Sequence, residues 1–105
     1  MDSKTIEVLD RYKQMLKQLG INPARVIVFG SHARGRAGKH SDIDVVVISE
    51  DFADMNLRER LEILGIAAAR IMEPVQAWGY TSEEFDARRQ GSFIEDEVKG
   101  AGVEV

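Results

Sequence analysis

The segment VIVFGSHARGRAGKHSDIDVVVIS, residues 26–49, contains two short apolar runs on either side of a polar, basic loop. Runs rich in β-branched residues are typical of buried strands in a sheet. The first run ends at Gly30 and Ser31, whereas the second includes Asp42 and Asp44 among valines and isoleucines. Because carboxylates are rarely buried without a partner, this segment predicts both a sheet and a site.

The rest of the chain predicts a single α/β domain, residues 1–105. The order of the expected elements leaves the strand directions open, so a small mixed sheet flanked by helices is as reasonable as a parallel one. The expected strands are 25–29, 42–49 and 74–80. The expected helices are 3–19, 56–71 and two short ones that start at the capping-box patterns in 81–84 and 92–95.

Two details of the second long helix can also be predicted. Asp51 or Asp54 is expected to cap its N-terminus, because an aspartate side chain can accept hydrogen bonds from the free N–H groups there. One apolar stripe is expected to face the core. The stripe consists of Leu57, Leu61, Leu64, Ala68 and Ile71.

The composition, 44% hydrophobic and 30% charged, is ordinary for a soluble globular protein. The formal net charge of -4 argues against direct nucleic-acid binding, which needs clustered Lys and Arg. The chain has no cysteine, which excludes disulfides and thiolate metal sites. No apolar run approaches the ~20 residues needed to cross a bilayer, so a cytoplasmic protein without membrane contact is expected.

The two aspartates are expected to act together. Residues two apart in a strand face the same side, so Asp42 and Asp44 point away from the side on which Ile43 and Val45 pack. Two close carboxylates repel each other unless they reach water or share a cation. Mg²⁺ or Mn²⁺ suits such oxygen ligands, especially together with substrate phosphates. The alternative is an exposed strand end with no metal.

Gly30 and Ser31 favour the metal interpretation. They lie at the carboxyl end of a predicted buried strand, where open α/β sheets usually bind ligands. A glycine there allows the backbone to approach a phosphate closely, and the following turn would direct free N–H groups at an anion. Arg34 would add a positive charge. The alternative is a simple turn that ends the strand.

Together these residues form the stretch GSHARGRAGKHSDIDVVV, which resembles the signature of the minimal nucleotidyltransferases of the DNA polymerase β-like superfamily. The resemblance covers nearly the whole chain and implies the fold of the polymerase β palm. It also implies metal-dependent transfer of a nucleoside monophosphate from a nucleoside triphosphate, most readily ATP, to a protein or small-molecule acceptor. By this resemblance Asp42 and Asp44 are the catalytic metal ligands, and Gly30, Ser31 and Arg34 bind the triphosphate.

One position departs from the family pattern, which has a third acidic residue on a neighbouring strand. Gln76 occupies that position, and an amide can neither accept a proton as a general base nor add negative charge to a metal. Glu73 is the nearest acid, but only a bulge at Pro74 would turn it inward. Trp78 shares the face of Gln76 and either packs there or stacks on a base. A catalytically weakened module that binds nucleotide or a partner is therefore the alternative function.

The resemblance also implies a protein partner. Minimal nucleotidyltransferases often resemble the antitoxin of a toxin–antitoxin pair, in which a separately encoded helical HEPN-type ribonuclease is silenced by adenylylation or by binding. Such a partner is expected to face the region near Arg34 and Trp78. In the C-terminal segment 93–105, Phe93, Ile94 and Val98 are expected to lie within a short acidic helix. The tail after this helix is expected to make few core contacts, and the alternative is that it folds back onto its own sheet.

Overall fold

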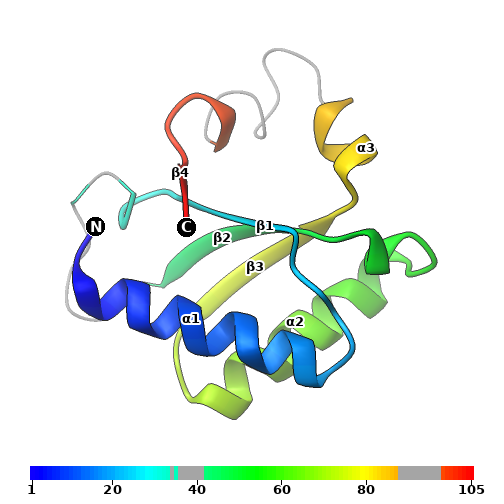
Figure 1. The fold of residues 1–105 in the computed structure, drawn as a ribbon, viewed down its shortest axis with the longest axis horizontal. Coiled ribbons are helices and arrows are strands. Elements are labelled where there is room, and N and C mark those ends of the chain that lie inside the picture. The colour runs from blue at the N-terminus through cyan, green and yellow to red at the C-terminus, as the bar shows by residue number, and fades with distance from the viewer. Residues whose placement is uncertain (34, 36–41, 88–97) are drawn as a thin grey trace.

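The computed structural model describes residues 1–33, 35, 42–87 and 98–105, and a four-stranded sheet lies at its centre (Figure 1). The strands, in the order β3-β2-β1-β4 across the sheet, are β1 (Arg25–Phe29), β2 (Ile43–Ile48), β3 (Val75–Tyr80) and β4 (Val103–Glu104). β2 runs antiparallel to β1 and parallel to β3. The predicted α/β fold with a mixed sheet is therefore confirmed, as are its three predicted strands.

Two apolar clusters enclose the sheet. The first lies beneath the two long helices, α1 (Ser3–Gln18) and α2 (Leu57–Ile71), and includes Tyr12, Leu64, Val45 and Val47. The second lies on the opposite face and includes Phe29, Val46, Ile48, Phe85 and Val98. Because both faces of β2 are buried, its sequence is a continuous apolar run rather than an alternating one.

The start of α2 differs from the prediction. Asn56 caps this helix, since its side chain accepts a hydrogen bond from the Glu59 N–H at 2.9 Å while the Glu59 carboxylate accepts one from the Asn56 N–H. The expectation that Asp51 or Asp54 provides the cap was wrong. The reciprocal pair satisfies two free N–H groups at once, and Asp51 lies instead in a preceding 3-10 helix, η1 (Glu50–Phe52).

The apolar stripe of α2 is also only partly buried. Leu64 and Ala68 pack into the core as predicted, but Leu57 and Leu61 are 67% and 45% exposed. Arg60 is buried in the first turns of the helix instead. Its side chain reaches the end of the sheet, so this part of the α2–sheet interface is polar rather than apolar.

The C-terminal residues return to the sheet. β4 pairs antiparallel with β1, the Val105 N–H donates to the Val26 carbonyl at 2.9 Å, and Arg25 forms an ion pair with Glu104 at 2.8 Å. The alternative that the tail folds back onto its own sheet is thus confirmed. Val98, which precedes the tail, is fully buried in the second cluster.

The first of the two predicted C-terminal helices is present. It is α3 (Ser82–Asp86), and the Thr81 hydroxyl caps it by accepting from the Glu84 N–H at 3.2 Å, as the capping-box pattern predicted. The second, predicted to start within 92–95, lies outside the described residues. Within the described part of the chain, every helix is too short or too polar to span a bilayer.

Candidate functional site

The predicted carboxylates lie at the beginning of β2, next to the end of β1. Asp44 is opposite Phe29 of β1 and opposite Gln76 of β3, so it lies between the two strands that the sequence singled out. Asp44 is half-buried, and Asp42, just before the strand, is exposed. β3 therefore places Gln76 beside this carboxylate, and β1 ends beside it just before Gly30.

Gly30 contacts Asp44 directly. Its φ of +72° lies in the left-handed region that favours glycine. A Cβ atom built on Gly30 would lie only 2.8 Å from the Asp44 Oδ2 atom, so no side chain fits there unless the carboxylate moves. The Gly-Ser turn and the Asp-x-Asp strand, which the sequence predicts to act together, thus lie next to each other.

A substitution at Gly30 tests this contact. We expect Gly30→Ala to lower the free energy of unfolding by more than Gly20→Ala, because both force alanine into left-handed backbone but only the first displaces a carboxylate. The shared backbone strain is about 1–2 kcal/mol. Gly20 is the matched control, because its φ is +91° and a Cβ atom added to it would have no neighbour within 4 Å. Equal losses in urea denaturation would contradict a close Gly30–Asp44 contact.

The electrostatics of Asp44 favour a bound cation. Burial raises the pKa of this carboxyl group above its ordinary value, the charge of Asp42 raises it further, and His32 acts in the opposite direction. A divalent ion between the two carboxylates would remove their repulsion. No group of three or more metal-binding side chains occurs among the described residues, so substrate oxygens would have to complete the coordination of an ion held here.

His32, in the turn after β1, lies near the candidate site, because its charge lowers the pKa of Asp44. Its Nδ1 atom lies 3.4 Å from the hydroxyl oxygen of Thr5, which is buried in α1. The loop continues as a turn in which the Gly35 N–H donates to the His32 carbonyl at 3.4 Å. Thr5 therefore connects the start of α1 to the loop after β1. The sequence contained a clue, because Thr5 is a polar residue on the same face of α1 as the buried Val8 and Tyr12.

Gln76 and Glu73 lie on opposite sides of the sheet. Gln76 is exposed and directly opposite Asp44 in the β2–β3 register. Glu73 forms an ion pair with Arg11 of α1 at 3.0 Å, on the side of the long helices. β3 follows Pro74 as a regular parallel strand, so the idea that a bulge turns Glu73 inward was wrong. Glu73 therefore does not take the place of the third acid that Gln76 replaces.

Trp78 packs against the second apolar cluster, which is the first of the two roles predicted for it. Its ring centroid is 5.6 Å from that of Phe29, at an interplanar angle of 52°. This tilted geometry is typical of aromatic packing in a core. Ser31 is half-buried in the turn after β1, and Arg34 lies outside the described residues, so its role stays a prediction.

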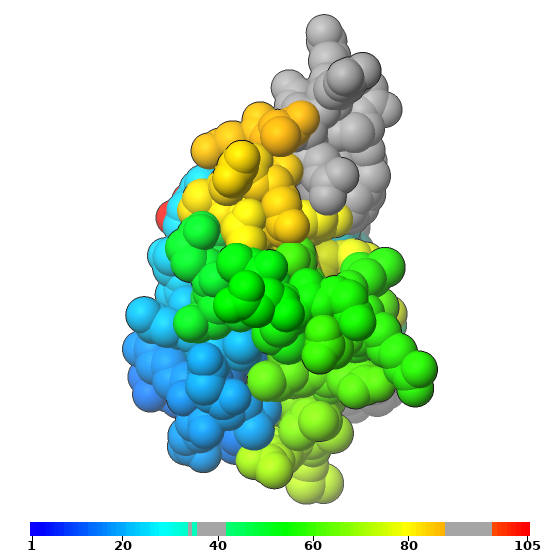
Figure 2. All heavy atoms as spheres, turned by 90° about the vertical axis from the view of Figure 1, so that its right-hand side faces the viewer, coloured from blue at the N-terminus to red at the C-terminus, as the bar shows by residue number. Residues whose placement is uncertain are grey.

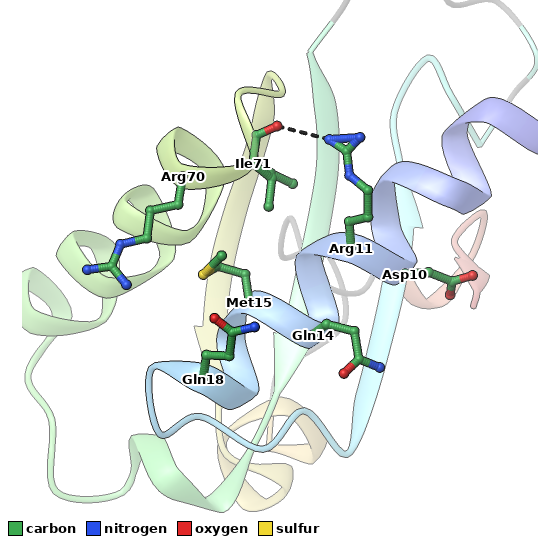
Figure 3. A pocket seen from close by; sticks show the side chains of 7 residues that line it. All are labelled: Asp10, Arg11, Gln14, Met15, Gln18, Arg70 and Ile71. Atoms are coloured by element: carbon green, nitrogen blue, oxygen red, sulfur yellow. Dashed lines mark hydrogen bonds between the residues drawn. The ribbon is translucent and has the colours of Figure 1, made fainter.

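A groove between α1 and α2 lies away from these residues (Figure 3). It has a volume of about 530 Å³ and is lined by Arg11, Gln14 and Arg70, among others. Arg11 donates from Nη2 to the Ile71 carbonyl at 2.9 Å across it (Figure 3). None of the predicted site residues that the structure describes lines this groove, so the candidate site remains the region around Asp44.

Comparison with known proteins shows the family of the chain. The family model described as "Nucleotidyltransferase domain" matches residues 9–105. The chain is 36% identical over 80 residues to the "Probable protein adenylyltransferase MntA" of Haemophilus influenzae, covering 75% of this chain and 69% of the relative. It is 30% identical over 107 residues to the "Putative protein adenylyltransferase MJ0141" of Methanocaldococcus jannaschii, covering 95% and 97% of the two chains.

Two solved structures share the fold. A "putative nucleotidyltransferase" from Sulfolobus solfataricus superposes with a TM-score of 0.58 and 23% identity, covering 94% of this chain and 79% of that one. A toxin–antitoxin crystallised with AMP-PNP superposes with a TM-score of 0.54 and 19% identity, covering 76% and 59%. At these identities the likeness concerns the fold alone.

Proposed function

This chain belongs to the nucleotidyltransferase domain family, and from that premise we propose that it binds a nucleoside triphosphate with Mg²⁺ or Mn²⁺ at Asp42 and Asp44 and transfers the nucleoside monophosphate. The contact between Gly30 and the Asp44 carboxylate supports the proposal most directly. It joins a phosphate-type loop to a pair of metal-type ligands within one short region.

Each residue has a specific part in the proposed reaction. Asp42 and Asp44 would hold the cations, and Gly30, Ser31 and Arg34 would hold the β- and γ-phosphates. Ions bound there would supply positive charge that offsets the charge developing on the phosphate oxygens. An acceptor oxygen attacks the α-phosphorus and loses its proton, the bond to the bridging oxygen breaks, and pyrophosphate leaves. ATP is the proposed donor because named relatives are adenylyltransferases.

The proposed acceptor is a separate protein. One relative is named as a protein adenylyltransferase, and a toxin–antitoxin shares the fold. A helical HEPN-type toxin, modified on a hydroxyl group or inhibited by binding, is therefore the proposed partner, and this chain the antitoxin. The second candidate function is a nucleotide-binding or partner-binding module with little turnover. It is favoured by Gln76, because an amide lies opposite Asp44 where the family pattern has an acid.

Nucleotide binding is the measurement that tests the site. We expect calorimetry with Mg²⁺ and α,β-methylene-ATP, whose α–β bridge cannot be cleaved, to show binding to the native chain. Both Asp42→Ala and Asp44→Asn should weaken it by more than about 100-fold, since even the loss of a residue that only supports a metal ligand costs about 10–100-fold. Asp54→Asn, which removes an exposed carboxylate from a different region, is the control.

Folding of the variants can be checked independently. Asp44→Asn should unfold at a temperature no lower than that of the native chain without metal, because burial and Asp42 disfavour the ionised carboxylate. Because the pKa of Asp44 is raised in the folded chain, protonation of Asp44 increases the free energy of unfolding at low pH. This contribution is lost as the pH rises through the raised pKa. Undiminished nucleotide binding in both site variants would refute the metal assignment.

A further inference from the structure

A second groove lies beside the outer edge of β3, near the end of this strand. It has a volume of about 390 Å³, and its walls include Met55, Leu57, Trp78 and Tyr80. Figure 2 shows the first turns of α2 and the neighbouring α3 on one face of the molecule, and residues of both line the groove. Leu57, in the first turn of α2, is 67% exposed and lines this groove.

The base of this groove is rigid. The buried Arg60 guanidinium donates to the carbonyls of Met55, Phe52 and Gly79 at 2.9, 2.7 and 3.2 Å. It also donates to both carboxylate oxygens of Glu84 at 2.6 and 3.1 Å. A surface held in this way need not be ordered when a partner binds, which reduces the entropic cost of association.

The same arginine determines which kind of segment can bind. The Tyr80 carbonyl accepts from the Ser49 N–H of the chain leaving β2, so the Gly79 carbonyl, one residue earlier, points away from β2. Arg60 already donates a hydrogen bond to that outward-pointing carbonyl oxygen. A partner strand could not pair with β3 at this position, because the acceptor that it needs is already used. The groove therefore suits a helix that inserts side chains rather than a strand.

Charge determines the chemistry of that helix. The segments that build the groove, 50–62 and 78–86, contain eight carboxylates and two arginines, a formal net charge of -6, whereas the whole chain carries -4. Within the lining itself Glu84 is paired with Arg60, so the excess negative charge belongs to the surrounding parts of these segments. A groove built from segments of net negative charge attracts a basic partner and repels an acidic one. Half-buried aromatic residues such as Trp78 and Tyr80 are the type that contributes most to binding at protein interfaces.

We infer that this groove binds an amphipathic helix of a partner protein, with apolar residues on one face and Lys or Arg around them. The groove begins where Trp78 follows Gln76 on β3, beside the proposed site. Binding there requires neither nucleotide nor metal, so this inference and the proposed function can fail separately. Asp44→Asn should leave helix binding intact, and a change at Leu57 should leave nucleotide binding intact.

A displayed library of helical peptides with randomised surface positions tests the inference. Peptides selected on the native chain should carry net positive charge and apolar residues at i, i+3 and i+4 spacing. They should bind Leu57→Asp at least tenfold more weakly than the native chain. Ile66→Asp, which changes another exposed α2 residue that does not line the groove, should bind as the native chain does. Both variants should fold, because the Leu57 and Ile66 side chains are 67% and 46% exposed and neither belongs to the buried core.

Trp78 provides a direct signal, since it is the one tryptophan of the chain and lines the groove. Its fluorescence should change when a selected peptide is added and should change less as salt is raised. Acidic or extended selected peptides, or equal binding to both variants, would overturn the inference. A concentration-dependent Trp78 change without peptide, abolished by Leu57→Asp, would also overturn it and would instead identify a second copy of this chain as the occupant.

Discussion

Gln76→Asp is expected to release pyrophosphate from ATP about 10²–10⁴ times faster than the native chain, the range that general-base assistance typically contributes. Gln76 is exposed and lies opposite Asp44 on the adjacent parallel strand. A carboxylate at this position would be close enough to share a cation with Asp44 and to take a proton from the acceptor. With water as the acceptor, the products are the nucleoside monophosphate and pyrophosphate, so the rate can be measured without knowledge of the natural acceptor.

Two further variants test whether the negative charge at position 76, rather than another change in the side chain, increases the rate of pyrophosphate release. Gln76→Asn shortens the side chain to the length of Asp but keeps it neutral, so its rate should stay at the native level. Glu73→Gln should also leave the rate unchanged, because Glu73 is held by Arg11 on the opposite side of the sheet. A fast native enzyme that is slowed by Gln76→Asp would show that the base lies elsewhere.

Arg60→Ala is expected to lower the free energy of unfolding by about 3 kcal/mol, the lower end of the range for removing one member of a buried charge pair. The Arg60 side chain is only 11% exposed, but the Glu84 side chain is 39% exposed and can regain water. The carbonyls of Phe52 and Gly79 would lose their charged donor. This loss is large relative to the ~5–15 kcal/mol of a typical domain.

The same helix offers a matched control. Arg58 forms an ion pair with Glu62 at 3.0 Å, but the Arg58 side chain is 88% exposed. Arg58→Ala should therefore change the free energy of unfolding by no more than about 0.5 kcal/mol. Equal effects of the two substitutions in urea denaturation would contradict a structural role for the buried Arg60.

The pH dependence of stability gives a second readout for Arg60. Its hydrogen bond is the main cause that lowers the pKa of Glu84 below the ordinary value of 4.5. The ionised Glu84 therefore contributes stability above pH 4.5 that is lost as the pH falls through the lowered value. The difference in stability between the native chain and Arg60→Ala should narrow over that acidic range. If the difference in stability between the two chains does not change with pH, the hydrogen bonds from Arg60 to the backbone carbonyls alone account for it.

The candidate site was largely readable in the sequence because its parts are short and local. β-branched runs predict strands, and the period of two along a strand places neighbouring aspartates on one face. The position of Gly30 and Ser31 at a strand end follows from the same pattern. The contact between Gly30 and Asp44 was not readable, because it depends on the antiparallel pairing of β1 and β2. Pairing register is a property of two segments together.

The errors at α2 have a different physical cause. Helical spacing predicts which residues share a face, but it does not say where along the helix that face is covered by the sheet. Leu57 and Leu61 lie on the predicted stripe and remain exposed, whereas Arg60 enters the interior. A buried arginine can be stable there only because four other groups accept its hydrogen bonds, and two of these groups, Gly79 and Glu84, come from later elements of the chain.

The sequence by itself thus determined the strands, the two carboxylates beside a Gly-Ser turn, and the neutral residue where the family has a third acid. Only the tertiary structure decided that Gln76 faces Asp44, that Glu73 is held by Arg11, and that the tail returns as β4. The first group depends on local backbone preferences and on the periodic alternation of side chains. The second depends on contacts between residues far apart in the chain, whose partners become fixed only when the strands and helices pack together.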